Sequence, residues 1–228
     1  MTKYFKFGRI NANALLFIFL ITVFSCNEKK SGKSSRVEVL PFYNEATFTP
    51  RWLDPNDSAL DTFHKIAPYK LINQEGKWVT EKTFEGKIYI ADFFFTICPG
   101  ICPKMTANMG ILQDEFENDD NILLLSHSVT PKIDSVPVLK EYAESSGILS
   151  HKWHLVTGPQ EEIYRLGRLD YFVEEDLGME KDLDEFLHTE NFVLVDRNRH
   201  IRGIYNGLNK NSINQLIADI KTLKKEKM

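Results

Sequence analysis

The most constraining stretch of this 228-residue chain is an apolar run that ends at two closely spaced cysteines. Residues 88–95 are almost continuously apolar, Cys98 and Cys102 follow with three residues between them, and Pro103 comes directly afterwards. A continuous apolar run is typical of a strand covered on both faces, and proline is tolerated in the first turn of a helix. The stretch therefore predicts a buried strand, a short loop with two thiols, and a helix.

The order of the remaining elements indicates an α/β domain. Apolar periodicity predicts further strands and helices over 70–80 (a hairpin), 103–116, 122–129, 153–156 and 192–205 (a second hairpin). We expect Asp134 and Ser212 to cap two more helices, and Thr157 or Gly158 to lead into another. A thioredoxin-like fold, with a mixed central sheet flanked by helices and an extra N-terminal hairpin, is the simplest architecture that fits.

The N-terminus has the pattern of an export signal. A basic start precedes an apolar run over 14–24, which is too short to span a bilayer as a permanent helix. The run ends in Ser25-Cys26, and a small residue before a cysteine resembles a bacterial lipobox. We expect residues 1–25 to be a lipoprotein signal peptide and Cys26 to be lipid-modified. An ordinary signal peptide with an incidental Cys26 is the alternative.

The chain after this signal divides into three parts. A polar stretch without apolar period predicts a flexible tether over 26–45, followed by an N-terminal extension over 46–66 and one domain over 67–225. The chain is acidic and has no basic cluster outside the signal and its last few lysines, which argues against nucleic-acid binding. Outside the cytoplasm, the remaining cysteine pair can be oxidised unless it is reduced or holds a metal.

A histidine lies just before the predicted strand at 192–195. In a thioredoxin-like fold the residues before that strand face the cysteine loop, so His188 is expected to meet Cys98 and Cys102. Two thiolates and one imidazole form a trigonal or open tetrahedral metal site. Soft thiolates select Cu(I), and imidazole also suits Cu(II). Zinc accepts the same ligands, although it usually takes four, so the residues alone leave zinc open.

The motif at the cysteines resembles that of a known family. Residues 96–103, Thr-Ile-Cys-Pro-Gly-Ile-Cys-Pro, are similar to the T-x-C-P-x-x-C-P signature of the Sco/SenC family. These thioredoxin-like proteins deliver copper to the dinuclear copper centre of cytochrome c oxidase. His188 matches the copper histidine of the family, and the resemblance covers about residues 67–225. It implies a copper-binding metallochaperone, rather than an enzyme, with Cys98, Cys102 and His188 as ligands of Cu(I), Cu(II) or both.

The resemblance also implies a partner and a location. The partner would be the cytochrome c oxidase subunit that carries the dinuclear copper site. The location would be the cell envelope, with the chain anchored to a membrane through lipid on Cys26 and facing the periplasm. Thr130 and Gly100 stand where the family usually has acidic residues, and the segment before His188 lacks the usual D-Y-x-V-x-H form. We therefore expect the surroundings of the site to differ from those in the family.

Two other functions remain open. Family members also resemble thiol–disulfide oxidoreductases, and thiols at a helix N-terminus suit reduction of the oxidase cysteines. The three-residue spacing, wider than the usual C-x-x-C, favours a metal site over this redox role. The other possibility is a non-catalytic binding module in which a Cys98–Cys102 disulfide locks a loop. A peroxidase is disfavoured because no lone activated thiol with an arginine beside it is evident. Four other histidines are expected at the surface or at strand ends rather than as ligands: His127, His151, His154 and His200.

Overall fold

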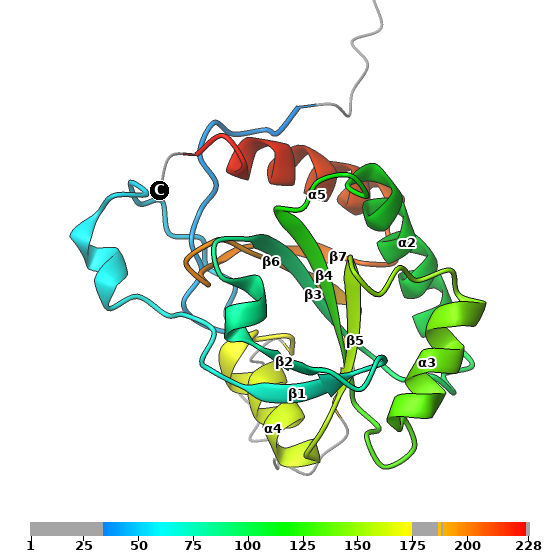
Figure 1. The fold of residues 1–228 in the computed structure, drawn as a ribbon. Helices are drawn as coiled ribbons and strands as arrows, with labels where there is room; N and C mark the ends of the chain where they lie inside the picture. Colours follow the sequence, from blue (N-terminus) through cyan, green and yellow to red (C-terminus); the bar gives the residue numbers. More distant parts are fainter. Residues whose placement is uncertain (1–33, 175–186, 188, 227–228) are drawn as a thin grey trace, which may run out of the picture. The chain divides into compact units, whose positions relative to one another are not determined.

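Seven strands form one mixed sheet in the described part of the chain, residues 34–174, 187 and 189–226 of a computed structural model (Figure 1). The strand order is β2-β1-β5-β4-β3-β6-β7. β4 is parallel to β3 and β5, and the other neighbours are antiparallel. The bounds are β1 (Lys70–Asn73), β2 (Trp78–Thr80), β3 (Ile88–Phe94), β4 (Ile122–Ser128), β5 (Trp153–Thr157), β6 (Asn191–Val195) and β7 (Ile201–Asn206). This confirms the predicted mixed sheet and both predicted hairpins.

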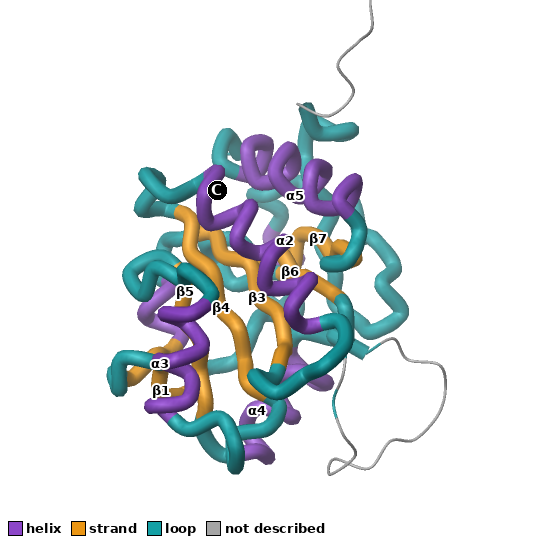
Figure 2. Tube along the Cα trace, turned by 90° about the vertical axis from the view of Figure 1, so that its right-hand side faces the viewer, coloured by secondary structure: helices purple, strands orange, loops and turns teal. Residues whose placement is uncertain are grey.

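Helices cover both faces of the sheet. Every residue of β3 is buried, and its alternate side chains enter two separate cores. Ile88, Ile90 and Phe94 pack on the side of α2 (Cys102–Glu115), α3 (Val136–Ser145) and α5 (Lys210–Leu223). The other side carries α4 (Gln160–Arg165). Figure 2 shows α2 in front of the central strands and α3 over β5 and β1. Burial on both faces explains why the sequence of β3 is apolar without alternation.

Two of the predicted helix caps are wrong. Asn209 caps α5 by accepting a hydrogen bond from the backbone of Asn211, and Ser212 lies inside the helix. Ser135 is at the N-cap position of α3, and Asp134 makes contacts elsewhere that are described below. Three short turns complete the structure: η1 (Ser58–Asp61), η2 (Glu81–Phe84) and the π-helical η3 (Leu166–Asp170), which continues α4.

A buried arginine holds the N-terminal segment on the domain. The Arg202 guanidinium on β7 donates to the carbonyl oxygens of Leu40 and Pro41, at 2.7 and 3.2 Å. It also pairs with Asp196 at 3.1 Å and with Glu226 at 2.7 Å. Glu226 in turn accepts from the backbone N–H of Leu40 at 2.9 Å. A charge this deeply buried requires such a full set of partners.

Candidate metal centre

The two cysteines lie where β3 gives way to α2, as the sequence predicted. Cys98 is in the loop and partly exposed, whereas Cys102 is the first residue of α2 and only 4% exposed. Both are free thiols. Two exposed apolar side chains, Ile97 and Ile101, precede them in the loop. One thiol therefore faces solvent and potential partners, while the other belongs to the core.

The environments of the two thiols push their pKa values in opposite directions. Partial burial opposes ionisation of Cys98, but hydrogen bonds from the backbone N–H groups of Cys102, Gly100 and Ile101 outweigh it and lower the pKa. Burial raises the pKa of Cys102 to about 12, and the nearby Cys98 and Asp92 add to this. Cys98 is thus the stronger nucleophile and the first thiol to offer a thiolate to a soft metal.

Asp134 joins the cysteine loop to the neighbouring strand. Its carboxylate accepts hydrogen bonds from the Thr96 hydroxyl at 2.5 Å and from the Thr96 backbone N–H at 3.3 Å. The hydroxyls of Ser128 and Thr130 donate to it at 2.5 and 3.0 Å. Four donors on one fully buried carboxylate fix the start of the cysteine loop. This role replaces the helix cap predicted for Asp134, and sequence spacing gave no sign of it.

A second buried carboxylate lies on β3 below the loop. Asp92 accepts a short hydrogen bond from the Ser126 hydroxyl, which itself accepts from the indole N–H of Trp153 at 2.8 Å. Burial raises the pKa of Asp92 to about 7, although the bond from Ser126 opposes this. The interruption of an apolar strand by Asp92 was the one sequence signal of this network.

Two of the four histidines predicted at the surface or at strand ends, His127 and His200, lie at strand ends, and both are buried. His127 is fully buried on β4 and stacks on Phe93 with ring centroids 4.6 Å apart. Burial lowers its pKa to about 4, so the ring is neutral. His200 is also buried, and its Nδ1 lies 2.9 Å from the carbonyl oxygen of His64. Both rings contribute to packing in the core rather than to the loop that carries the thiols.

The third expected ligand, His188, lies outside the described residues, as does Cys26. Among the residues that are described, no group of three or more His, Cys, Asp or Glu side chains could hold a metal ion. The neighbours of His188 are placed, however. Leu187 is fully buried, and the Thr189 hydroxyl donates to the carbonyl oxygen of Val173 at 2.7 Å.

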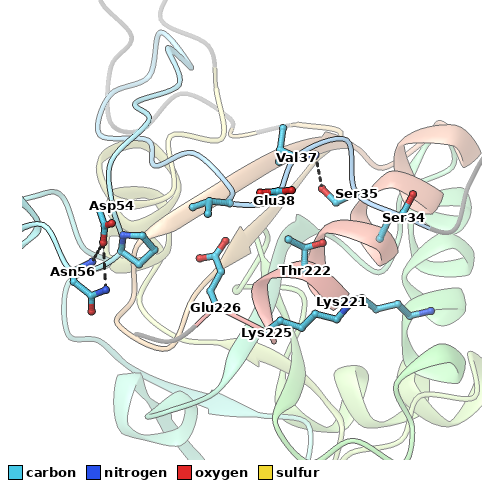
Figure 3. Close-up of a pocket in the computed structure, with 13 residues that line it drawn as sticks. Ser34, Ser35, Val37, Glu38, Asp54, Asn56, Lys221, Thr222, Lys225 and Glu226 are labelled. Atoms are coloured by element: carbon cyan, nitrogen blue, oxygen red, sulfur yellow. Dashed lines mark hydrogen bonds between the residues drawn. The ribbon is translucent and has the colours of Figure 1, made fainter.

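A cavity of about 550 Å³ lies away from the cysteines (Figure 3). It is formed by residues between Ser34 and Val39, residues 54–56, the end of α5 with Lys221, and Lys225 and Glu226 after the helix. Neither cysteine lines it. The thiols therefore lie outside this cavity, Cys98 in the loop after β3 and Cys102 buried at the start of α2.

The family model described as SCO1/SenC matches residues 57–225, which include the cysteine loop and the whole sheet. The chain belongs to the SCO1/SenC family.

Solved structures from this family agree with the fold. BsSco, described as a member of the Sco family of cytochrome c oxidase assembly proteins with a disulfide switch, is 28% identical with a TM-score of 0.60. The alignment covers 72% of this chain and 95% of BsSco. A SCO1/SenC family lipoprotein from Bacillus anthracis is 29% identical with a TM-score of 0.62, over 71% of this chain and 96% of that one. The fold is therefore thioredoxin-like, as predicted.

Another SCO1/SenC relative has been solved with copper bound. ScoI from Arabidopsis thaliana is 27% identical with a TM-score of 0.53, and the alignment covers 68% of this chain and 97% of that one.

Thr130, where the resemblance leads us to expect an acidic residue, takes part in the contacts of Asp134. The Thr130 hydroxyl donates to Asp134 at 3.0 Å, and the Thr130 backbone N–H donates to the hydroxyl of Ser128. An acidic side chain at position 130 would bring a second negative charge to Asp134 and remove one of its donors. Gly100, the other departure, has nothing within 4 Å of where a Cβ would be, so space does not require glycine there.

Proposed function

We propose that this protein is a copper-binding metallochaperone of the Sco/SenC type that delivers copper to the dinuclear copper site of cytochrome c oxidase. Copper is its cargo. The observation that carries the proposal is the pair of free thiols at the N-terminus of α2, one partly exposed and one buried, in a chain of the SCO1/SenC family. Two sulfur ligands favour Cu(I) over hard cations. A relative with copper bound supports this choice of metal.

The proposed ligands are Cys98, Cys102 and His188. Cys98 would bind first because its pKa is lowered, and binding would then draw the proton from Cys102, whose pKa is raised. Metal binding releases protons from both thiols, so copper affinity should rise with pH. The lipoprotein relative from Bacillus anthracis supports a further proposal, that lipid on Cys26 anchors the chain to a membrane with its domain facing the periplasm.

The proposed domain limits follow the same division. Residues 1–25 would be removed as the signal, 46–66 would be the extension and 67–225 the Sco domain. The tether predicted over 26–45 would be shorter, because Leu40 is buried in the core and its carbonyl oxygen accepts from Arg202. No helix within 34–174, 187 and 189–226 has both the length and the apolar character that a membrane crossing requires.

The decisive experiment is metal analysis of the reduced protein after loading with copper. We expect about one copper ion per chain, retained against a competing chelator. His188→Ala should bind copper far more weakly, and Cys98→Ser should bind almost none. Equal copper affinity in wild type and His188→Ala would contradict the ligand set. A chain that takes up no metal and keeps a disulfide resistant to mild reductants would instead support a structural role for the pair.

The opposed pKa shifts of Cys98 and Cys102 favour a second candidate function, thiol–disulfide exchange. The Cys98 thiolate would attack one sulfur of a partner's disulfide and release the other as a thiolate. Cys102, after losing its proton, would then attack the Cys98 sulfur. The products are a Cys98–Cys102 disulfide and the reduced dithiol of the partner, so two electrons pass to the partner.

The same variant separates the two functions. Exchange requires both cysteines but no imidazole. His188→Ala should therefore reduce a model disulfide at the wild-type rate while losing tight copper binding. Loss of both activities in His188→Ala would argue against two separable roles.

A further inference from the structure

Three exposed isoleucines lie in the segments that carry and adjoin the Cys98 thiol. Ile97 directly precedes Cys98 and is 62% exposed, whereas Ile101 directly precedes Cys102 and is 38% exposed. Ile133, in the loop after β4, is 48% exposed. Single exposed apolar side chains need no explanation, but several at one place mark a surface that another molecule covers. The placement of Ile133 relative to the cysteines therefore decides whether the three form one surface.

Hydrogen bonds bring Ile133 to the cysteine loop. Ile133 directly precedes Asp134, whose carboxylate accepts from the hydroxyl of Thr96 at 2.5 Å, and Thr96 directly precedes Ile97. The backbone N–H groups of Ile133 and Asp134 donate to the carbonyl oxygen of Thr130, at 2.8 and 2.9 Å, and these bonds fix the turn. The isoleucines therefore belong to two linked loops at the edge of the sheet where the parallel strands β3 and β4 end.

The exposed charges of the two linked segments are both positive. Within residues 95–107 the one Asp, Glu, Lys or Arg is Lys104, and within 129–137 there are Lys132 and Asp134. Asp134 is fully buried and accepts from its four donors, whereas both lysines are exposed. Among the described residues, no carboxylate forms an ion pair with either lysine. This surface, which we call the thiol rim, consists of Ile97, Ile101, Lys104, Lys132 and Ile133.

A group that exchanges with the cysteines has to approach across this rim. Cys98 is partly exposed and Cys102 is only 4% exposed, so an incoming group meets Cys98 first. A membrane would cover the isoleucines but brings no sulfur, and a small thiol would make no use of three apolar side chains. A protein segment with its own cysteines meets both requirements. Because both exposed charges are positive, carboxylates beside those cysteines would complement the rim.

We propose that the thiol rim docks a partner protein whose cysteines lie in an apolar segment flanked by acidic side chains. This rests on the proposed exchange at Cys98, of copper or of a disulfide. The isoleucines would supply the apolar contact at the centre of the interface. The lysines would act mainly on the rate of association and on the choice of partner, because long-range attraction between opposite charges steers the encounter.

The test uses two peptides that differ only in charge. Each contains one Cys-x3-Cys unit with the same apolar residues between the cysteines, flanked by four glutamates in one peptide and by four lysines in the other. Two reactions are followed with each peptide. In the first, the reduced protein passes two electrons to the peptide disulfide and forms the Cys98–Cys102 disulfide. In the second, the copper-loaded protein transfers Cu(I) to the reduced peptide, without change of oxidation state.

Wild-type protein should prefer the acidic peptide. At an ionic strength of about 10 mM we expect it to react about fivefold faster or more than the basic one, and the ratio should approach one in about 0.5 M salt. Lys104→Glu/Lys132→Glu should reverse the preference. Lys77→Glu/Lys225→Glu is the matched control, since it makes the same change of charge in the β1–β2 turn and after α5, outside both linked segments. It should keep the wild-type preference.

The apolar contact is tested with both peptides and with 2-hydroxyethyl disulfide, which is small and uncharged. Ile97→Thr and Ile133→Thr should each slow the reaction with both peptides about threefold or more, and should reduce 2-hydroxyethyl disulfide at the wild-type rate. Ile111→Thr is the control, because Ile111 is a 40% exposed isoleucine of α2 outside the rim. It should behave as wild type in every reaction.

The possible outcomes separate this inference from the proposed function. Wild-type protein that neither reduces 2-hydroxyethyl disulfide nor binds copper would end both. If it performs either reaction but treats the two peptides alike at low salt, or if the lysine and isoleucine variants match wild type, this inference alone fails. Binding to lipid vesicles that Ile97→Thr and Ile133→Thr abolish would assign the rim to a membrane instead. Dimers in sedimentation that the same variants dissociate would assign it to a second copy of the chain, and either result overturns the inference.

Discussion

The hydroxyl of Thr96 lies 2.5 Å from a carboxylate oxygen of Asp134, a residue 38 positions later in the chain. Thr96 begins the turn that leads to Cys98, and Asp134 ends the loop after β4. This hydrogen bond links the cysteine loop directly to the loop after β4. The position of the partly exposed Cys98 thiol therefore depends on Asp134, which lies far from it in sequence.

Removing the Asp134 carboxylate should weaken both the fold and the thiol loop. Asp134→Ala leaves the donors of Thr96, Ser128 and Thr130 without their acceptor, and we expect a loss of about 2–4 kcal/mol in the free energy of unfolding. Urea unfolding measures this change. Asp114→Ala on the exposed face of α2 is the control and should change stability by less than about 0.5 kcal/mol. Equal stability of the two variants would contradict the assigned role.

Restoring the acidic residue of the family at position 130 should destabilise this particular protein. Thr130→Asp would face Asp134 across about the same distance as the present 3.0 Å hydrogen bond. Repulsion should raise the pKa of the new carboxylate in the folded state above its unfolded value. The destabilisation should therefore be about 1–2 kcal/mol at pH 7 and disappear as the pH falls and the group is protonated. Thr130→Val, which loses the donor without adding charge, should show no such recovery in acid.

Asp92 should make stability depend on pH. Its pKa in the folded state is about 7, above the ordinary value of 3.8, so the folded form holds its proton more tightly than the unfolded form. Its effect is absent below about pH 4 and becomes destabilising as the pH rises through 7. Asp92→Asn keeps an acceptor for Ser126 and should be more stable than wild type at pH 8 by about 2–4 kcal/mol, relative to the difference at pH 4. If the free energies of unfolding of wild type and Asp92→Asn changed in parallel between pH 4 and pH 8, the effect would be disproved.

The two cysteines should react at very different rates. At pH 7.5, iodoacetamide should modify Cys98 at least tenfold faster than Cys102, because Cys98 is partly exposed with a lowered pKa and Cys102 is buried with a raised one. Peptide mass spectrometry after short reaction times measures both rates. In urea the difference should vanish. Preferential modification of Cys102 in the native protein would reverse the assignment of the attacking thiol.

Much of the fold could be predicted because burial leaves a direct mark on sequence. The apolar run of β3 and the proline after Cys102 specify strand, loop and helix without reference to distant residues. Caps could not be predicted as well, because an aspartate near a helix start has several possible donors. Asp134 uses Thr96, which only the folded chain brings near.

The candidate site was predictable only in part for the same reason. Cys98 and Cys102 are close in sequence and share a motif. The thiol rim joins two loops through a hydrogen bond between residues 38 positions apart, and no spacing rule relates Ile97 to Ile133. The burial of His127 could have been predicted, because it lies within the apolar run of β4, where a polar side chain must be buried.

Arg202 fastens the two ends of the described chain to each other. The same guanidinium donates to the carbonyl oxygen of Leu40 near one end and to the carboxylate of Glu226 at the other. Detachment of either end would therefore disturb the contacts of the other. Trimming a few residues from the C-terminal side would loosen a segment almost two hundred positions earlier. Within the described residues, the segment that enters the fold at Leu40 is therefore anchored by the same side chain that binds Glu226.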